Sequence, residues 1–598
     1  MIGSDRPTAR PRHSRSGGSR RVRPLRVALA GFAVVVTGWV AWLAVDAAHA
    51  RAELLTAAQL VVGMREQVVA GDRAGAQEAL GQVQEHASAA LEATHGPHRS
   101  AAAVLPWVGR NVRAVQAASE VVDALATEVL PSLIDVAKTV EPAALAPVDG
   151  RVDLAPLEAA APVVVAAAES VAAGQARLDG FEPGSLWPAI AGPLAELREQ
   201  LDEVAMITAT ASRSVQLLPP MLGADGPRTY LVLVQNPAEP RSTGGVPALV
   251  VVRAEGGAID VVEQRSSGVG DLTEPALPLT REEQSLFSDM VGSYMADVTF
   301  TPDFPRSGEL AQAIWEQEAG SELDGVLSIE PGAIGMILGV TGPVTLSNGV
   351  QLTAANAAQW LMNTVYLEYP TNDEHDALFA EATALTFGAL ASGQWDAPAM
   401  VDVLAADARE GRLMIWSAHP EEQALLAPTV LSGELRGVQG ESPVIGVFFN
   451  DGSQSKMGYY LRADVSATTT ECFNDGSQEV TVTVALASTA PEDAADLPSY
   501  ISGGRVLPAG QMRVNVLLYA PEGGWVDTVR VQGAEPGVHA QFHDGLAVAG
   551  KTIVLAPGGQ VVIEYDVRTG PDQSGAPVLR VTPLALRTVT SDAAGTSG

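Results

Sequence analysis

The residues best suited to chemistry lie between two apolar runs in the segment Tyr230–Val252. The polar centre of this segment consists of Gln235, Asn236, Glu239, Arg241, Ser242, Thr243, Gly244 and Gly245. Arg241 offers a planar fork that suits a carboxylate or a phosphate. The paired glycines let a ligand or another backbone approach closely. We therefore predict a ligand-binding site in the loop Gln235–Gly245, with Asp303 as a further member.

Two interpretations of this loop stay open. In the first, the loop is one rim of a cleft, because sites in open α/β sheets lie beyond the strand ends. This requires Tyr230–Val234 to be a central strand. In the second, Arg241 forms an internal salt bridge with Glu239 or Asp303, and the polar side chains only satisfy the loop's own backbone.

Common catalytic motifs are absent from the sequence. It contains no GxSxG, GxxxxGK or HExxH segment, which removes the commonest serine hydrolases, P-loop NTPases and zinc proteases. Ser453 and Lys456 have SxxK spacing. Since they precede a predicted strand, Met457–Ala463, instead of opening an apolar helix, we interpret the spacing as coincidence.

Metal and thiol chemistry have little support in the sequence. His539 and His543, with Asp544, lie on a predicted strand and turn without further ligands, so we expect an exposed β edge there. Cys472 is the only cysteine, which excludes an intrachain disulfide, and we expect it to be buried and inert. We expect no metal and no cofactor.

Strand and helix patterns alternate over residues 226–435, which predicts a layered α/β domain. Predicted strands are Tyr230–Val234, Ala248–Val252, Ile259–Val262, Gly325–Ile329, Val344–Leu346 and Leu413–Trp416. Predicted helices are Ser307–Glu318, Gly332–Gly339, Leu352–Leu367, Asp376–Gly393 and Pro398–Glu410. The central strand would then place the loop Gln235–Gly245 at one edge of the sheet.

Several of these segments, in this order, resemble the bacterial, actinobacterial-type family called domain of unknown function 4012. The motifs are QNPAEPRSTGG from Gln235, TPDFP from Thr301, DGVLSIEPGAIGMILGVTGPV from Asp324, LTAANAAQWL from Leu352, GRLMIWSAHPEEQALL from Gly411 and SKMGYYL from Ser455. The resemblance implies an architecture and a surface location, without an activity.

A more remote similarity is to the LytR-CpsA-Psr family, which the order of loop, strand, helix and acidic turn resembles. Those proteins transfer glycopolymers from a polyprenyl pyrophosphate carrier, with arginines on the pyrophosphate and aspartates on a divalent metal. The similarity implies that Arg241 would hold a pyrophosphate. However, Ser242 and Thr243 stand where that family has an aspartate, and the turn Tyr369–Phe379 lacks its arginines. Arg265 could substitute only if its strand delivers it to the same face.

The N-terminus predicts a membrane anchor. Residues 27–45 contain no charge and approach the roughly 20 residues that span a bilayer. Eight arginines precede them in residues 1–26, so the positive-inside rule places this basic segment in the cytoplasm and the bulk of the chain outside. The alternative is a signal peptide cleaved after Ala50, at the small-residue pattern Ala48-His49-Ala50.

Two further regions flank the α/β domain. Residues 46–220 are rich in alanine, with apolar positions stepping by three and four, which predicts an antiparallel helical bundle or stalk. Expected helix breaks are His95–Pro97, Pro142–Gly150, Gly180–Pro193 and Pro219–Pro220. Residues 436–587 contain short strands separated by turns, as in an antiparallel β-sandwich, and residues 588–598 are predicted to be disordered.

Charge and composition narrow the partners. Residues 46–598 carry 29 basic and 69 acidic side chains, which should repel nucleic acid and anionic membrane surfaces. Lysine is rare, at three residues against 34 arginines, as in GC-rich bacterial genomes.

Together these features predict a multidomain α+β protein: transmembrane helix, helical bundle, α/β domain and β-sandwich. The first functional hypothesis is a membrane-anchored extracytoplasmic protein that binds or organises an envelope glycan or a protein partner. The alternative is a LytR-CpsA-Psr-like transferase or hydrolase acting on polyprenyl-linked wall glycans. It requires a divalent metal, an apolar groove beside Arg241 and at least two converging carboxylates.

Overall fold

The computed structural model describes residues 45, 48–57, 59–61, 63, 67, 73–96, 101–106, 108–139, 146–266, 268, 271–369, 371–586 and 589–592. The predicted basic segment 1–26, and the predicted transmembrane segment 27–45 apart from Val45, lie outside the described residues. Contacts divide the chain into two compact units. The first holds the described residues up to Thr139 together with Ala161–Ser212, and the second holds those of 140–160 and 213–598.

The first unit is built from long helices, as the alanine-rich pattern predicts. They are α2 Arg73–Thr94, and α4 Gly109–Ala124 continuing through the π-helical turn η1 Leu125–Val129 into α5 Leu130–Thr139. To these are added the parts of α6 Ala155–Asp179 and α7 Pro188–Met221 that lie within Ala161–Ser212. A short 3-10 turn, η3 Pro183–Ser185, joins the last two. The apolar stripes of α4, α6 and α7 meet in one core that includes Ala117, Val171 and Leu201, whereas Val83 and Ala87 of α2 pack with Ala126 in a separate cluster. The expected break Gly180–Pro193 is found between α6 and α7, but it ends earlier than predicted, because α7 begins at Pro188 and contains Pro193.

One described helix, α6, is long and apolar enough to cross a membrane by length and composition. About a third of its most apolar window is buried within the protein, at 33%. Val171 and Leu178 of this helix are fully buried in the core of the first unit. Its apolar character is therefore used at least in part for packing between helices.

A five-stranded mixed sheet lies at the centre of the second unit, in the order β3-β2-β1-β4-β7. Its strands are β1 Arg228–Asn236, β2 Gly245–Glu255, β3 Ala258–Ser266, β4 Gly325–Ile329 and β7 Leu413–Ser417. Only β1 and β4 are parallel, with Val232 paired to Leu327. The Gly256-Gly257 turn, with φ of 54° and 86°, joins β2 to β3 tightly. The predicted strand Tyr230–Val234 is therefore central, with neighbours on both sides.

Helices cover both faces of this sheet. On one face lie α8 Arg281–Phe287, α9 Met290–Ser293, η4 Met295–Phe300 and α10 Phe304–Ala319, whose apolar residues pack with Leu231, Leu233 and Leu249. The chain then forms α11 Pro331–Thr341, α12 Ala357–Gln359, η5 Trp360–Thr364, α13 Val365–Glu368, α14 Asn372–Ala391, α15 Ala397–Arg409, α16 Pro420–Leu426 and η6 Val430–Ser432. Phe387 of α14 packs on the face formed by Tyr230, Val232 and Val250. The predicted strand at Val344 is reduced to a small ribbon of β5 Val344–Thr345 and β6 Gln351–Leu352.

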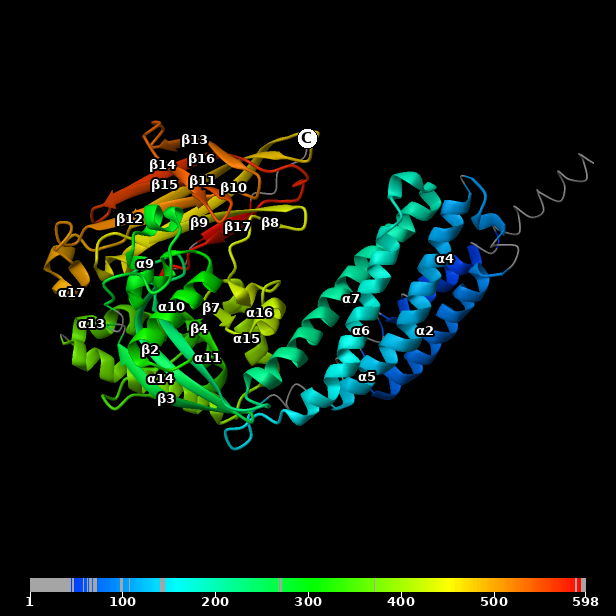
Figure 1. Cartoon of the computed structure of the whole chain (residues 1–598), viewed down its shortest axis with the longest axis horizontal. Helices are drawn as coiled ribbons and strands as arrows, with labels where there is room; N and C mark the ends of the chain where they lie inside the picture. The colour runs from blue at the N-terminus through cyan, green and yellow to red at the C-terminus, as the bar shows by residue number, and fades with distance from the viewer. Residues whose placement is uncertain are drawn as a thin grey trace, which may run out of the picture. The chain divides into compact units, whose positions relative to one another are not determined.

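Two further sheets lie above the mixed sheet in Figure 1, drawn from yellow to red. One has the order β13-β16-β11-β10-β18 and the other β14-β15-β12-β9-β17, with β8 Val438–Gln439 paired to β9. The bounds are β9 Ser442–Asp451, β10 Leu461–Cys472, β11 Gln478–Ser488, β12 Met512–Tyr519, β13 Trp525–Val531, β14 His539–His543, β15 Leu546–Leu555, β16 Gln560–Arg568, β17 Val578–Val581 and β18 Val589–Asp592. Short helical turns η7 Lys456–Tyr460, η8 Ala494–Asp496 and α17 Ser499–Ser502 connect them. Residues of both sheets share one apolar core, to which β11 contributes every second residue.

Four expectations for this region need correction. The predicted strand Met457–Ala463 begins as the 3-10 turn η7, and extended structure starts only at Leu461. Cys472, expected to be buried, is exposed at the end of β10. His543 lies on an edge strand as expected, yet it is only 2% exposed. The predicted disordered tail contains β18, which pairs with β10 in parallel.

The mixed sheet and its helices share two cores with the β sheets within the second unit. One core joins Leu361 and Tyr366 to Val447 and Val514 of the β sheets. Another joins Leu231 of β1 to Phe448 and Tyr519. Both faces of β9 are thus buried, one between the β sheets and the other against the mixed sheet. The loop after β1 enters this shared interior.

Candidate functional site

The loop from Gln235 to Gly245 folds back on itself between β1 and β2. The amide of Glu239 donates to the carbonyl of Asn236 at 3.0 Å, and the amide of Gly245 donates to the carbonyl of Glu239 at 3.1 Å. A Cβ on Gly245 would lie 2.6 Å from the Glu239 carbonyl oxygen. The glycine therefore serves a close approach of the loop's own backbone.

Arg241 is buried, at 9% exposure. Its Nε and Nη2 donate to Oδ1 of Asp297 at 3.0 and 2.8 Å, and its guanidinium lies 4.5 Å from the centre of the Phe300 ring. Burial lowers the pKa of Arg241, but Asp297, Asp451 and Glu239 outweigh this effect and hold its pKa above the ordinary value. Arg241 is therefore a permanent buried cation. Its internal partner is Asp297 of η4, and neither Glu239 nor Asp303.

Glu239 has a different cation, Lys456 of η7. The ammonium of Lys456 lies 2.6 Å from Oε1 of Glu239, and the lysine is 1% exposed. The ammonium also lies 4.6 and 4.9 Å from the ring centres of Tyr366 and Tyr500. Burial alone would raise the pKa of Glu239, but Lys456 and Arg241 lower it, so the pair is ionised. Sequence reasoning considered Lys456 only for its SxxK spacing with Ser453 and did not place it beside Glu239, although it is one of three lysines in the chain.

The other polar residues of the loop are likewise directed inward. The amide nitrogen of Gln235 donates to Oγ1 of Thr243 at 3.2 Å, and that of Asn236 donates to the Tyr366 hydroxyl at 3.1 Å. Ser242 donates through its hydroxyl to the carbonyl of Phe300 at 2.6 Å. The structure therefore brings the predicted residues of the loop Gln235–Gly245 together, but with their polar groups on partners inside the protein.

Asp303 lies apart from Arg241, at the start of α10. Its carboxylate accepts the amide of Arg306 at 3.2 Å as a helix cap and the amide of Leu435 at 2.7 Å. Burial raises the pKa of Asp303 to about 6, against the lowering effect of these two amides. Asp303 thus ties α10 to the connection that leads into the β sheets.

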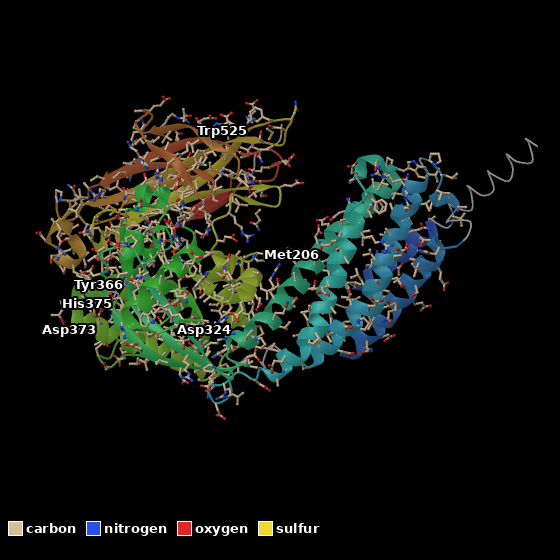
Figure 2. All side chains as sticks on the ribbon, viewed as in Figure 1. Met206, Asp324, Tyr366, Asp373, His375 and Trp525 are labelled. Carbon is tan, nitrogen blue, oxygen red and sulfur yellow. The ribbon has the colours of Figure 1, made fainter. Side chains whose placement is uncertain are left out.

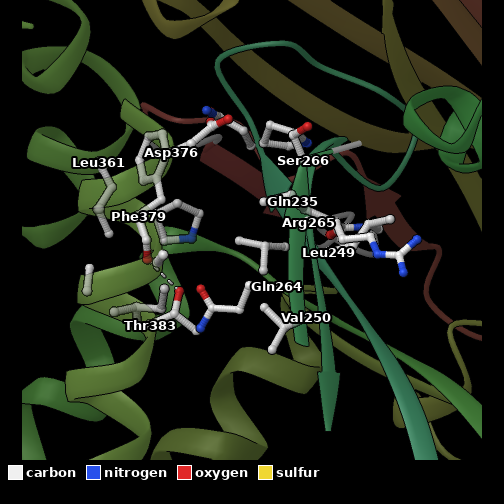
Figure 3. Close-up of a pocket in the computed structure, with 18 residues that line it drawn as sticks. Gln235, Leu249, Val250, Gln264, Arg265, Ser266, Leu361, Asp376, Phe379 and Thr383 are labelled. Atoms are coloured by element: carbon white, nitrogen blue, oxygen red, sulfur yellow. Dashed lines mark hydrogen bonds between the residues drawn. The ribbon is translucent and has the colours of Figure 1, made fainter. Parts of the chain in front are cut away.

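A cavity of about 260 Å³ begins where β1 ends, between the mixed sheet and α14. We call it the sheet–helix cavity. Its lining is mostly apolar and consists of Val234, Gln235, Asn236, Pro247, Ala248, Leu249, Val250, Gln264, Arg265, Ser266, Pro331, Ile334, Leu361, Asp376, Phe379, Ala380, Ala382 and Thr383. Figure 3 shows Gln264 reaching from β3 toward α14 and Thr383. Two residues of the predicted site, Gln235 and Asn236, thus border a real cavity, and Arg241 is not among its lining residues.

The ionisable residues of this cavity are Arg265 and Asp376. Figure 3 shows the Arg265 guanidinium directed away from the helices, and it lies 5.0 Å from the Trp315 ring centre on the other face of the sheet. Its Nε donates to Oε1 of Glu263 at 2.5 Å. Arg265 therefore does not replace Arg241 as an anion-binding group. Burial raises the pKa of Asp376, with a smaller opposing effect of His375.

The acidic turn Tyr369–Phe379 is the beginning of α14. Thr371 and Glu374 form a reciprocal capping box, and His375 is buried, with its ring 4.7 Å from that of Tyr366. Among the residues that the structure describes, no group of three or more His, Cys, Asp or Glu side chains could hold a metal ion. The acidic residues here lie at the N-terminus of α14, where negative charge interacts favourably with the helix dipole.

Comparisons with known proteins give two similarities. The crystal structure of protein gbs0355 from Streptococcus agalactiae is similar at 9% identity and a TM-score of 0.24, over 36% of this chain and 75% of that chain. No curated protein matches this chain. Residues 225–366 match the family model described as protein of unknown function (DUF4012), which confirms the expected resemblance over this segment.

Proposed function

We propose that this protein is a membrane-anchored, extracytoplasmic binding protein of the bacterial cell envelope that takes the apolar chain of an envelope lipid into the sheet–helix cavity. The observation that carries the proposal is the cavity itself, about 260 Å³ in volume and lined mostly by apolar side chains. Pockets for drug-sized ligands measure about 300–1,000 Å³. This smaller volume suits a single prenyl or acyl chain.

The proposed location rests on the sequence of the N-terminus. An uncharged run at residues 27–45 follows eight arginines, which favours a cytoplasmic N-terminus and an external body. A protein held at the bilayer surface has direct access to lipids. The cavity would then receive a chain that the surrounding membrane supplies.

The geometry favours binding over group transfer. A transferase acting on a polyprenyl pyrophosphate needs a free cation beside the lipid chain, to hold the anionic head group. Arg241 is already paired with Asp297, and Arg265 points away from the cavity. Asp376 is the single carboxylate that lines the cavity. We therefore propose a ligand held by its chain, with no reaction at its head group.

The test is photocrosslinking of the full-length protein in detergent. Two probes distinguish the lipid source: a diazirine-bearing farnesyl phosphate and a diazirine-bearing fatty acid. We expect at least one probe to label peptides from β1 to β3 or from α14. Ala380→Trp, which fills the cavity, should reduce this label at least about fivefold. Ala384→Trp is the matched control, because Ala384 lies on the same helix, exposed and outside the cavity lining.

Labelling that is spread evenly over the chain, or that Ala380→Trp leaves unchanged, would refute the cavity as the lipid site. Both tryptophan variants are first compared with the wild type by their thermal midpoints. This comparison separates loss of ligand from loss of fold.

A further inference from the structure

A second concave site lies in the β sheets. A groove of about 450 Å³ runs between β13, at the edge of one sheet, and β14, at the edge of the other. We call it the Trp525–Phe542 groove. Its lining residues are Trp525, Val526, Asp527, Thr528, Val529, Glu535, Pro536, Val538, Ala540, Gln541, Phe542, Ala547, Val548 and Ala549. Figure 2 places Trp525 at the outer surface of these sheets, on the opposite side of the second unit from Asp373 and His375 of α14.

Two large aromatic rings stand exposed in this groove. Trp525 is 48% exposed and Phe542 is 62% exposed, although both belong to regular strands. The indole nitrogen of Trp525 donates to Oδ1 of Asp527 at 2.7 Å, which limits rotation of the ring. Exposing two rings leaves apolar area in water, which is unfavourable. A ligand that covers both rings would recover this free energy.

The charged residues of the groove are both acidic. Asp527 and Glu535 are exposed, and the lining includes no lysine, arginine or histidine. Carboxylates accept hydrogen bonds from hydroxyl groups, and such charge-assisted bonds are among the stronger ones. They also repel phosphate and carboxylate groups on a ligand. The groove therefore selects against anionic polymers.

We propose that the Trp525–Phe542 groove binds a neutral oligosaccharide of pyranose units. A pyranose ring combines an apolar face of C–H groups with a rim of hydroxyl donors. The two rings would cover the apolar faces of separate sugar units, and Asp527 and Glu535 would accept hydroxyl groups from the rim.

A basic peptide is the main competing occupant, because carboxylates and aromatic rings also attract cations. A cage for one cation needs ring faces around a single point, within about 6 Å. The closely spaced ring pairs of the described residues do not include Trp525 or Phe542. The rings are thus separate platforms, as an extended chain of sugar units requires.

The test is isothermal titration of the full-length protein with chitohexaose, cellohexaose and maltohexaose. The protein is kept in an amine-oxide detergent, because a glycoside detergent would compete for the groove. We expect at least one hexasaccharide to bind, and we expect Trp525→Ala and Phe542→Ala each to weaken its binding at least about tenfold. Trp187→Ala is the matched control: Trp187 is 51% exposed but belongs to the helical unit, and its loss should change the affinity less than about twofold.

Three results would overturn the proposal. The first is that none of the three hexasaccharides binds at about 5 mM. The second is that a hexasaccharide binds but Trp525→Ala leaves its affinity unchanged. The third is that decalysine binds in a Trp525-dependent manner and the hexasaccharides do not. Ala380→Trp, the variant that fills the sheet–helix cavity, should leave saccharide binding intact. Failure of the saccharide site and failure of the lipid site can therefore be told apart.

Discussion

Arg241 shows how a residue suited to binding an anion can instead hold a fold together. Its guanidinium donates to Asp297 through Nε and Nη2 and to the carbonyl of Pro240 through Nη1, and it lies over the ring of Phe300. Removing one member of a buried ion pair leaves the other charge without compensation, which costs far more than loss of a surface pair. The residue that most resembles a ligand contact in the sequence is therefore expected to matter first for stability.

We predict that Arg241→Met destabilises the second unit by about 3–5 kcal/mol. Adding Asp297→Asn should restore part of this loss, because the uncompensated carboxylate disappears. The control is Arg253→Met: the Arg253–Glu255 pair is 3.1 Å long, but its side chains are 50% and 62% exposed, so we expect a loss below about 1 kcal/mol. Thermal unfolding of the three variants measures the effect. Equal losses for Arg241→Met and Arg253→Met would contradict the structural role of Arg241.

We expect the burial of Asp407 on α15 to make the free energy of unfolding depend on pH. The residue is 2% exposed, and its Oδ2 has no hydrogen-bond partner. Burial, with a further contribution from Glu330, raises the pKa of Asp407 to about 7. The folded state therefore binds this proton more tightly than the unfolded state, and stability is lost as the pH rises from about 4 to about 7.

Asp407→Asn should remove this loss. We expect the variant to be more stable than the wild type by about 1–2 kcal/mol at pH 8 and to lose the advantage at pH 4. Thermal midpoints at both pH values provide the measurement. An advantage of the same size at pH 4 and pH 8 would show that titration of Asp407 is not the cause.

At the scale of elements, η7 packs directly on the loop Gln235–Gly245. A Cβ on Gly458 would lie 2.2 Å from Cδ of Pro240 and 2.7 Å from the carbonyl oxygen of Ala238. Neither atom can move without shifting the loop, because the Pro240 carbonyl also accepts the amide of Asp451 at 2.7 Å. The approach of these two segments therefore depends on a residue without a side chain.

We predict that Gly458→Ala destabilises the second unit by about 1–3 kcal/mol. Gly388→Ala is the matched control, because Gly388 lies on α14 with no atom within 4 Å of a Cβ added there. That substitution should stabilise by up to about 1 kcal/mol through helix propensity. Opposite shifts of the thermal midpoint are expected, and a stabilising Gly458→Ala would contradict the packing described.

Elements with a regular apolar pattern could be predicted from the sequence. The alternation of Val480, Val482 and Val484 places one face of β11 in the core, as found, because the period of a strand is a local property. Partners across the fold could not be predicted. Asp297 lies 56 residues after Arg241, and Lys456 lies 217 residues after Glu239. Charge pairing has no period, so the sequence offered several carboxylates for Arg241 and no means of choosing among them.

The two concave sites could not be predicted for the same reason, because their residues are distant in the sequence. Trp525 and Phe542 look unremarkable in the sequence, because their strands come together only through the topology of two sheets. The sheet–helix cavity combines residues from β1, β2, β3, α11, η5 and α14. Sequence reasoning located its rim at Gln235 and Asn236 but could not tell which side chains turn toward it.

At the scale of the whole molecule, the second unit should fold as one body. One of its cores combines residues of the mixed sheet with residues of β9, β12 and β15, and another combines helices that follow β4 with both β sheets. A chain that ends after Arg436 would expose the apolar residues of the mixed sheet that normally pack against β9 and β12.

We therefore predict that a chain truncated after Arg436 yields no protease-resistant α/β fragment. A chain truncated after Asp592, which keeps β17 and β18, should remain resistant. Limited proteolysis followed by mass spectrometry of the fragments compares the two. A stable fragment that ends near residue 435 would show that the mixed sheet folds alone.

The hydroxyl of Thr582 donates to the carbonyl of Ser242 at 3.0 Å, across 340 residues of chain. At about 5–20 residues per second, roughly 20–70 s pass between the synthesis of Ser242 and the synthesis of Thr582. If the chain is exported as it is made, the first strands of the mixed sheet emerge long before the strands that cover them. Chaperones outside the membrane would then have an extended period in which to bind it, and any chain cut short before residue 582 would remain open to proteases.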